Sequence, residues 1–247
     1  MTNKYMYFIA NWKMFGGLST LNSLNKVIKF LKIFKKSNKT KIIYCPPSTL
    51  INPMSKKVMN SKIQVGAQNC HESLTYGAST GSINPMMLTN VGAKYVILGH
   101  SENRELGETD KLINNKIKAA TKSGLKVIFC IGETLSEKRK KRTNKVLAQQ
   151  ITSGLKSIKN TSNIIIAYEP VWSIGTGLIP KPNDLSNSIS FIKSKFRKKT
   201  PRVLYGGSVN NKNITEIKDI NVIDGFLIGG ASQSPKKFID IIKKTFN

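Results

Sequence analysis

Residues 164–177 read Ile164-Ile165-Ile166-Ala167-Tyr168-Glu169-Pro170-Val171-Trp172-Ser173-Ile174-Gly175-Thr176-Gly177. They begin with an uninterrupted apolar run, which is typical of a strand buried on both faces of a parallel sheet. The strand delivers the carboxylate of Glu169 into a glycine-rich segment that has the composition of a lid closing over a site. This pattern predicts that Glu169 is a general base at a strand end. The plainer alternative is a strand-end carboxylate held in a structural ion pair.

The alternation of apolar strand and helix recurs along the whole chain. Strand-like runs lie near residues 5–10, 41–45, 63–67, 95–98, 126–130, 163–167, 202–205 and 225–228, and helix-length segments separate them. Eight alternations in 247 residues predict a closed (β/α)8 barrel of the α/β class, formed as a single domain over residues 1–247. In such barrels the catalytic groups gather at the C-terminal ends of the strands, so residues far apart in sequence meet at one pocket.

Helix boundaries are marked by residues with known positional preferences. Thr109 can cap the free N–H groups of a helix that ends before Gly124, and Pro182 and Pro235 stand at helix starts, where a proline disturbs the helix least. In the first helix, apolar residues repeat at helical spacing at Leu21, Leu24, Ile28 and Leu31. The helices are therefore expected to pack one apolar side on the barrel.

The chain carries 40 Lys and Arg against 13 Asp and Glu, which gives a formal net charge of +27. A balance of this size raises nucleic acid as a partner. The basic residues are dispersed along the predicted surface helices, with dense runs at 138–142 and 197–199, and no aromatic residues stand among them to stack on bases. We therefore expect no specific nucleic-acid partner and interpret the charge as a compositional bias of exposed positions.

Cysteine and histidine usage argues against redox and metal chemistry. Cys45, Cys70 and Cys130 form no CxxC pair, and we interpret them as small core residues in a reducing compartment rather than as catalytic thiols. Two histidines without ligand spacing predict no metal site. No stretch has the length of a membrane span, and residues 1–4 lead into the first strand without the apolar core of a signal peptide. A cytoplasmic protein with no membrane partner is expected.

Four other segments also end an apolar strand in polar or glycine-rich residues: Tyr7-Phe8-Ile9-Ala10-Asn11-Trp12-Lys13-Met14, Tyr95-Val96-Ile97-Leu98-Gly99-His100-Ser101-Glu102, Leu204-Tyr205-Gly206-Gly207-Ser208-Val209 and Asp224-Gly225-Phe226-Leu227-Ile228-Gly229-Gly230-Ala231-Ser232. Together with residues 164–177, in this order and spacing, they resemble the triosephosphate isomerases over essentially the whole chain. The resemblance implies a TIM barrel and an aldose–ketose isomerase, which interconverts dihydroxyacetone phosphate and D-glyceraldehyde 3-phosphate through an enediolate in glycolysis and gluconeogenesis. It also implies a homodimer that needs no cofactor.

The resemblance assigns catalytic roles to four residues. Glu169 moves a proton between C1 and C2 of the triose, and His100 polarises the carbonyl and moves protons between the two oxygens. A helical turn that starts after His100 favours the neutral imidazole, an arrangement for which triosephosphate isomerases are themselves the standard illustration. Lys13 stabilises the anionic enediolate, and Asn11 supports Lys13. For His100 taken alone, a packed core histidine is the alternative.

Phosphate binding is expected to rest on backbone N–H groups, which glycine allows to approach closely. By resemblance the substrate-binding residues are Asn11, Lys13, Gly175, Ser208, Gly229 and Gly230. A Gly-Gly pair by itself is more often a turn, but such pairs follow both the seventh and the eighth strand, where many barrels bind phosphate. A lid over residues 170–180, latched by Tyr205 and Ser208, is expected to close on the phosphate and exclude water.

The chain departs from the family pattern at several positions. Phe15 stands where asparagine is usual and Ser173 where alanine is common, and Leu178-Ile179-Pro180 occupies the variable end of the lid. Ser82 and Asn103 stand where the family commonly has an acid and an arginine that link two subunits. Because both charges are lost together, neither is left unpaired, and a homodimer is still expected.

Two other functions are weighed against this one. Another phosphosugar barrel is the nearest enzyme, but those barrels lack this combination of Asn-Trp-Lys, Gly-His-Ser-Glu and Tyr-Glu-Pro-Val-Trp motifs. A basic nucleic-acid-binding barrel with vestigial catalysis is the alternative from a different class, and the intact catalytic residues argue against it. His71 has no companion motif and is interpreted as structural or interfacial.

Overall fold

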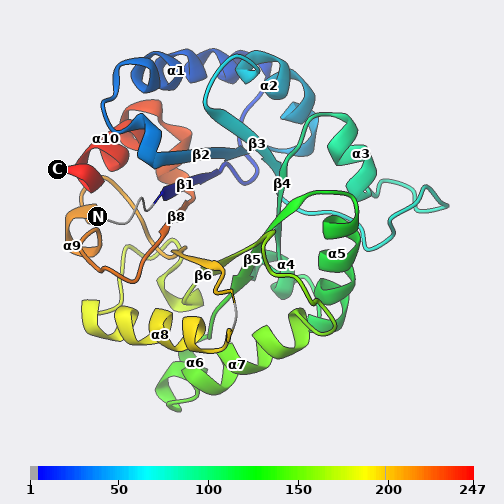
Figure 1. Cartoon of the computed structure of the whole chain (residues 1–247), viewed down its shortest axis with the longest axis vertical. Helices are drawn as coiled ribbons and strands as arrows, with labels where there is room; N and C mark the ends of the chain where they lie inside the picture. Colours follow the sequence, from blue (N-terminus) through cyan, green and yellow to red (C-terminus); the bar gives the residue numbers. More distant parts are fainter. Residues whose placement is uncertain (1–4, 198) are drawn as a thin grey trace.

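The computed structural model describes residues 5–197 and 199–247. Eight parallel strands form a closed barrel in the order β1 to β8, with β8 pairing back to β1 (Figure 1). The strands are β1 Met6–Asn11, β2 Thr40–Cys45, β3 Ile63–Ala67, β4 Tyr95–Leu98, β5 Lys126–Ile131, β6 Ile164–Tyr168, β7 Arg202–Tyr205 and β8 Gly225–Ile228. The predicted (β/α)8 barrel is confirmed, and no predicted strand boundary is wrong by more than one residue. Residues 1–4 and the Lys198 member of the predicted basic run lie outside the described residues.

Helices form a ring around the barrel (Figure 1). The α-helices are α1 Leu24–Ile33, α2 Ile51–Val58, α3 Pro85–Asn90, α4 Ser101–Glu105, α5 Asp110–Lys122, α6 Leu135–Arg139, α7 Thr143–Gly154, α8 Pro182–Ser194, α9 Ile214–Ile217 and α10 Pro235–Phe246. Short 3-10 helices are η1 Leu18–Ser23, η2 Ser37–Lys39, η3 Ser48–Leu50, η4 Val171–Ser173 and η5 Gly230–Gln233. Among the residues described, none of the helices is long and apolar enough to cross a membrane.

The predicted helix starts are confirmed, with one difference near the first helix. Thr109 caps α5, since its Oγ1 accepts a hydrogen bond from the N–H of Leu112 at 3.3 Å. Pro182 and Pro235 begin α8 and α10. Leu21, however, lies in η1 and not in α1. Segment 18–23 is rich in Ser, Thr and Asn, whose side chains compete for backbone hydrogen bonds and so weaken an α-helix.

The core has two layers because side chains alternate along each strand. One layer fills the barrel interior with residues such as Ile9, Ile43, Ile128 and Leu204. The other lies between the strands and the surrounding helices. Cys45, Cys70 and Cys130 are free and buried, as predicted for core residues.

Candidate active site

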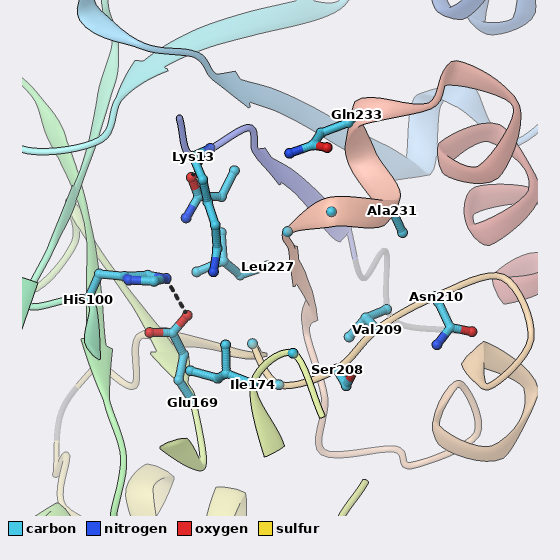
Figure 2. A pocket seen from close by; sticks show the side chains of 16 residues that line it. Lys13, His100, Glu169, Ile174, Ser208, Val209, Asn210, Leu227, Ala231 and Gln233 are labelled. Atoms are coloured by element: carbon cyan, nitrogen blue, oxygen red, sulfur yellow. Dashed lines mark hydrogen bonds and ion pairs between the residues drawn. The ribbon is translucent and has the colours of Figure 1, made fainter. Parts of the chain in front are cut away.

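One cavity of about 390 Å³ lies at the C-terminal ends of the strands, and it gathers every predicted site residue. Figure 2 shows Lys13, His100 and Glu169 on one side of this cavity and Ser208 on the other. The residues that line it include Asn11, Lys13, His100, Glu169, Gly175, Ser208, Gly229 and Gly230. Segments separated by as much as 222 residues, from Asn11 to Gln233, thus meet in one place.

Glu169 directly follows β6, and its backbone N–H donates to the carbonyl of Ile131 on β5 at 2.8 Å. The residue is only 3% exposed. This burial raises the pKa of the Glu169 carboxyl, and the nearby His100 and the Cys130 thiol oppose the rise. The carboxyl needs the glycine at position 206, because a Cβ there would lie 2.6 Å from Glu169 Cγ. A desolvated carboxylate of raised pKa is suited to general-base chemistry near neutral pH.

The two Glu169 oxygens differ in their surroundings. Oε1 lies 3.4 Å from Nε2 of His100, the contact drawn as a dashed line in Figure 2. Oε2 is buried and has no hydrogen-bond partner in the part of the chain that the structure describes. An unpaired buried carboxylate oxygen is unfavourable for folding, and such atoms are characteristic of functional sites. Oε2 is therefore available to accept a proton.

His100 is the N-cap residue of α4. Its Nδ1 accepts a hydrogen bond from the N–H of Glu102 at 3.3 Å. Because Nδ1 is an acceptor, the proton of the neutral ring lies on Nε2, the nitrogen that faces Glu169. The helix start thus fixes both the orientation of the imidazole and its tautomer. Nε2–H is placed to donate to an oxygen in the cavity.

Lys13 has a backbone φ of 54°, which a side chain other than glycine rarely adopts. This conformation is held from two sides. The Lys13 N–H donates to Oδ1 of Asn11 at 3.0 Å, and the Lys13 carbonyl accepts from Nε2 of Gln68 at 2.9 Å. Strain of this kind persists only where the surroundings enforce it, and it is concentrated at active sites. Asn11 and Gln68 therefore set the direction in which the Lys13 ammonium group leaves the backbone.

The Lys13 ammonium group pairs with Oε1 of Glu102 at 2.5 Å. Oε2 of Glu102 lies 3.6 Å from Nδ1 of His100, so this carboxylate lies between the cation and the imidazole. No role was predicted for Glu102, which appeared in the sequence analysis only as part of the motif around His100. An acidic residue in the first turn of a helix next to a candidate histidine was the available signal. Its contact with Lys13, 89 residues away, has no signature in the sequence.

The far side of the cavity is formed by the lid and by the loops after β7 and β8. Gly175 has a φ of 71°, a conformation that favours glycine. A Cβ at Gly230 would meet no atom within 4 Å, so crowding inside the chain does not explain glycine there. An open approach to its backbone is what phosphate recognition by N–H groups needs.

The base of the lid is tied to a carboxylate that sequence reasoning missed. Nε1–H of Trp172 donates to Oε1 of Glu133 at 2.9 Å, and the Tyr168 hydroxyl donates to Oε2 at 3.1 Å. Burial raises the pKa of the Glu133 carboxyl. Nζ of Lys138 lies over the indole ring, 3.5 Å from the Trp172 ring centroid. These contacts fix the N-terminal end of the lid. Glu133 follows Gly132 at the end of the apolar run 127–131, so its place after a strand was the available signal, while its bond to Trp172 had none.

The site's chemistry is that of proton transfer. It combines a buried carboxylate, an imidazole that donates from Nε2 and a paired ammonium group. Nowhere in segments 5–197 and 199–247 do three or more His, Cys, Asp or Glu side chains gather in a way that could hold a metal ion.

Comparison with known proteins identifies the family of this chain. The family model for triosephosphate isomerase matches residues 6–245. The triosephosphate isomerase of Thermodesulfovibrio yellowstonii is 40% identical over 244 residues, covering 96% of this chain and 98% of the relative. That of Zygosaccharomyces bailii is 42% identical over 245 residues, covering 96% and 97%. The crystal structure of triosephosphate isomerase from Bartonella henselae superposes with a TM-score of 0.88 at 33% identity, covering 98% of this chain and 99% of that one. The chain belongs to the triosephosphate isomerase family.

Proposed function

We propose that this chain is a triose-phosphate isomerase that interconverts dihydroxyacetone phosphate and D-glyceraldehyde 3-phosphate through an enediolate, in glycolysis and gluconeogenesis. The observation that carries the proposal is the buried pair formed by Glu169 Oε1 and His100 Nε2, 3.4 Å apart at the wall of one cavity. This pair supplies a proton acceptor and a proton donor to adjacent atoms of a substrate. The family membership agrees with it.

The geometry supports the following sequence of steps. Glu169 removes a proton from C1 of dihydroxyacetone phosphate, and the C–H electrons form the C1–C2 double bond of the enediolate. Nε2–H of His100 stabilises the negative charge that develops on the carbonyl oxygen, and Lys13 adds a positive charge nearby. Glu169 then returns the proton to C2, while His100 moves a proton from the oxygen on C1 to the oxygen on C2. These proton transfers need no electron acceptor and no cofactor.

The remaining lining residues are assigned to substrate binding. Backbone N–H groups of Gly175, Gly229 and Gly230 would hold the phosphate with Ser208 beside them, while Asn11 acts through Lys13. The lid then excludes water from the enediolate. The absence of a span-length apolar helix from the described residues and the glycolytic family support a cytoplasmic location.

A coupled assay on the purified protein tests the proposal. We expect turnover in both directions, unchanged by a metal chelator and without added cofactor. A protein that folds but converts neither triose phosphate would refute the assignment. Testing other phosphosugars in the same preparation would then decide whether the chain is a different phosphosugar barrel.

Lys13→Met is expected to weaken the binding of a phosphate-bearing inhibitor by about 10- to 100-fold, because a charge-assisted contact is lost. Titration calorimetry measures the affinity. Lys26→Met, on the exposed side of α1, is the matched control and should bind normally. Unchanged affinity in Lys13→Met would show that the backbone groups alone hold the ligand.

We further propose a homodimer. The segment over residues 71–82 projects from the barrel beside α3 (Figure 1) and carries the 65%-exposed Tyr76. Met14 is 99% exposed and Leu18 is 69% exposed. Exposed apolar groups of this size support an interface with another chain.

At the proposed interface, Ser82 and Asn103 offer no ion pair. Dimer dissociation should therefore depend little on salt at that contact. Restoring both charges with Ser82→Asp and Asn103→Arg should tighten the dimer more than the sum of the single changes. Analytical ultracentrifugation of the four proteins measures the coupling. Strict additivity would show that the two positions do not meet across an interface.

The net charge of +27 predicts that kcat/KM falls as salt rises while kcat stays nearly constant. The field of dispersed surface lysines is screened beyond roughly 8 Å at physiological ionic strength, whereas groups under a closed lid are shielded from added ions. Steady-state kinetics across a sodium chloride series measures both quantities. The same charge predicts weak adhesion to nucleic acid that moderate salt removes. Tight, sequence-selective binding at physiological salt would instead establish nucleic acid as a second ligand.

A further inference from the structure

Ser173 is the last residue of η4, and its side chain is completely buried. Its hydroxyl reaches three groups. Oγ lies 2.6 Å from the carbonyl oxygen of Leu178 at the opposite end of the lid, and 2.9 Å from the hydroxyl of Tyr205 at the end of β7. The backbone N–H of Ser208 donates to the same oxygen at 3.4 Å. One hydroxyl thus joins both ends of the lid to the loop after β7.

The directions of these hydrogen bonds follow from the chemistry of a hydroxyl group, which has one proton and two lone pairs. A carbonyl oxygen can only accept, so Ser173 gives its proton to Leu178. The Tyr205 hydroxyl must then donate to Ser173, and the N–H of Ser208 takes the second lone pair. Every donor and acceptor of this hydroxyl is in use.

The neighbouring chain is shaped around this cluster. A Cβ at Gly207 would lie 2.7 Å from Ser173 Oγ and 2.3 Å from the Tyr205 hydroxyl, so only glycine leaves room for both. Thr176 closes the lid on itself, since its Oγ1 donates to the carbonyls of Trp172 and Ser173 at 3.3 Å and accepts from the N–H of Leu178 at 3.2 Å. The lid is therefore a compact unit, and Ser173 bonds it to Tyr205 and to the loop after β7.

We propose that Ser173 is a positioning residue that fastens the lid in the conformation seen here, in which Ile174 and Gly175 line the cavity. An alanine at this position has no atom that could make any of the three bonds. Pro180, near the other end of the lid, has no N–H with which to replace them.

This inference rests on the proposed isomerase function, because a fastened lid matters only if it covers a reactive intermediate. In an enediolate exposed to water, the electrons of the enediolate expel the phosphate from C3. The oxyanion on C1 re-forms a carbonyl, the C1–C2 double-bond electrons form a C2–C3 double bond, and the C3–O bond breaks with its electron pair leaving on inorganic phosphate. A lid that stays closed suppresses this loss. Loosening the lid should therefore raise the ratio of phosphate released to product formed.

The test compares Ser173→Ala with Ser194→Ala, which removes an exposed hydroxyl that donates to the Phe191 carbonyl on α8, remote from the lid. In Ser173→Ala, buried partners lose their hydrogen bond, and we expect 2-phosphoglycolate to bind about tenfold more weakly by calorimetry. We also expect phosphate release per isomerisation to rise by a similar factor. Ser194→Ala should match the wild type in both. Ser173→Ala with wild-type or tighter binding and unchanged phosphate release would overturn the inference.

A double-mutant cycle distinguishes loss of the hydrogen bond between Ser173 and Tyr205 from a general loss of packing in the lid. Tyr205→Phe removes the donor to Ser173, so the double variant should bind 2-phosphoglycolate little worse than the weaker single variant. Fully additive losses would show that the two hydroxyls act independently and would overturn the inference. Failure of the proposed isomerase function is distinguishable from failure of this inference, because in the first case the wild type would not isomerise triose phosphates. The binding comparison between Ser173→Ala and the wild type does not need turnover.

Discussion

Glu169→Gln is expected to lower kcat by about 10²- to 10⁴-fold, since the amide keeps the shape of the carboxylate but cannot accept a proton from carbon. Binding of 2-phosphoglycolate persists, because the Lys13 contact and the phosphate-binding loops remain. Steady-state kinetics and calorimetry measure the two effects. Glu216→Gln, an exposed carboxylate change on α9, is the control and should leave kcat unaltered. Activity of Glu169→Gln within about tenfold of the wild type would exclude Glu169 as the base.

The pH dependence of kcat/KM is a second test of Glu169 as the base. Burial raises the pKa of Glu169, and the base works only when it is deprotonated. In the wild type, kcat/KM should therefore fall as the pH drops through this raised pKa, at a higher pH than an exposed glutamate would give.

His100→Gln is expected to lower kcat by about 10²-fold or more with a modest change in KM, because the donor that meets the developing oxyanion is lost. His71→Gln is a matched control within the chain. Its Nδ1 accepts from the N–H of Ser73 at 3.0 Å, just as His100 accepts from Glu102 at 3.3 Å. The control should keep kcat near the wild-type value. Kinetics and thermal melting separate the two interpretations of His100, because unfolding of His100→Gln would favour a packed core histidine.

The barrel was predictable from the sequence because its signal is repeated. Runs such as 95–98 and 225–228 carry four apolar or glycine residues between turn signals, and the structure places strands over those same ranges. The gathering of Asn11, His100 and Glu169 followed from topology, since the C-terminal ends of parallel strands converge. The start of the first helix was less predictable, because local hydrogen bonding at residues 18–23 competes with the apolar period.

The supporting contacts of the site could not be predicted. Gln68 holds Lys13 from 55 residues away, and Glu133 holds Trp172 from 39 residues away. A single polar side chain in a loop has no periodicity, and its partner is fixed only when the chain folds. Ser173 shows most clearly that hydrogen-bond partners cannot be predicted from the sequence. The sequence marks it as a departure from the family, but its three hydrogen-bond partners emerge only from the folded lid.

The central claim is that Glu169 moves a proton between adjacent carbons of a triose phosphate. The most direct measurement follows the reaction of dihydroxyacetone phosphate by nuclear magnetic resonance in deuterium oxide. The proton that Glu169 removes can exchange with solvent before it is returned. The wild type should therefore form glyceraldehyde 3-phosphate with deuterium on C2 and recover substrate with deuterium on C1, while Glu169→Gln does neither at a comparable rate. Isomerisation or exchange by Glu169→Gln at the wild-type rate would contradict the account.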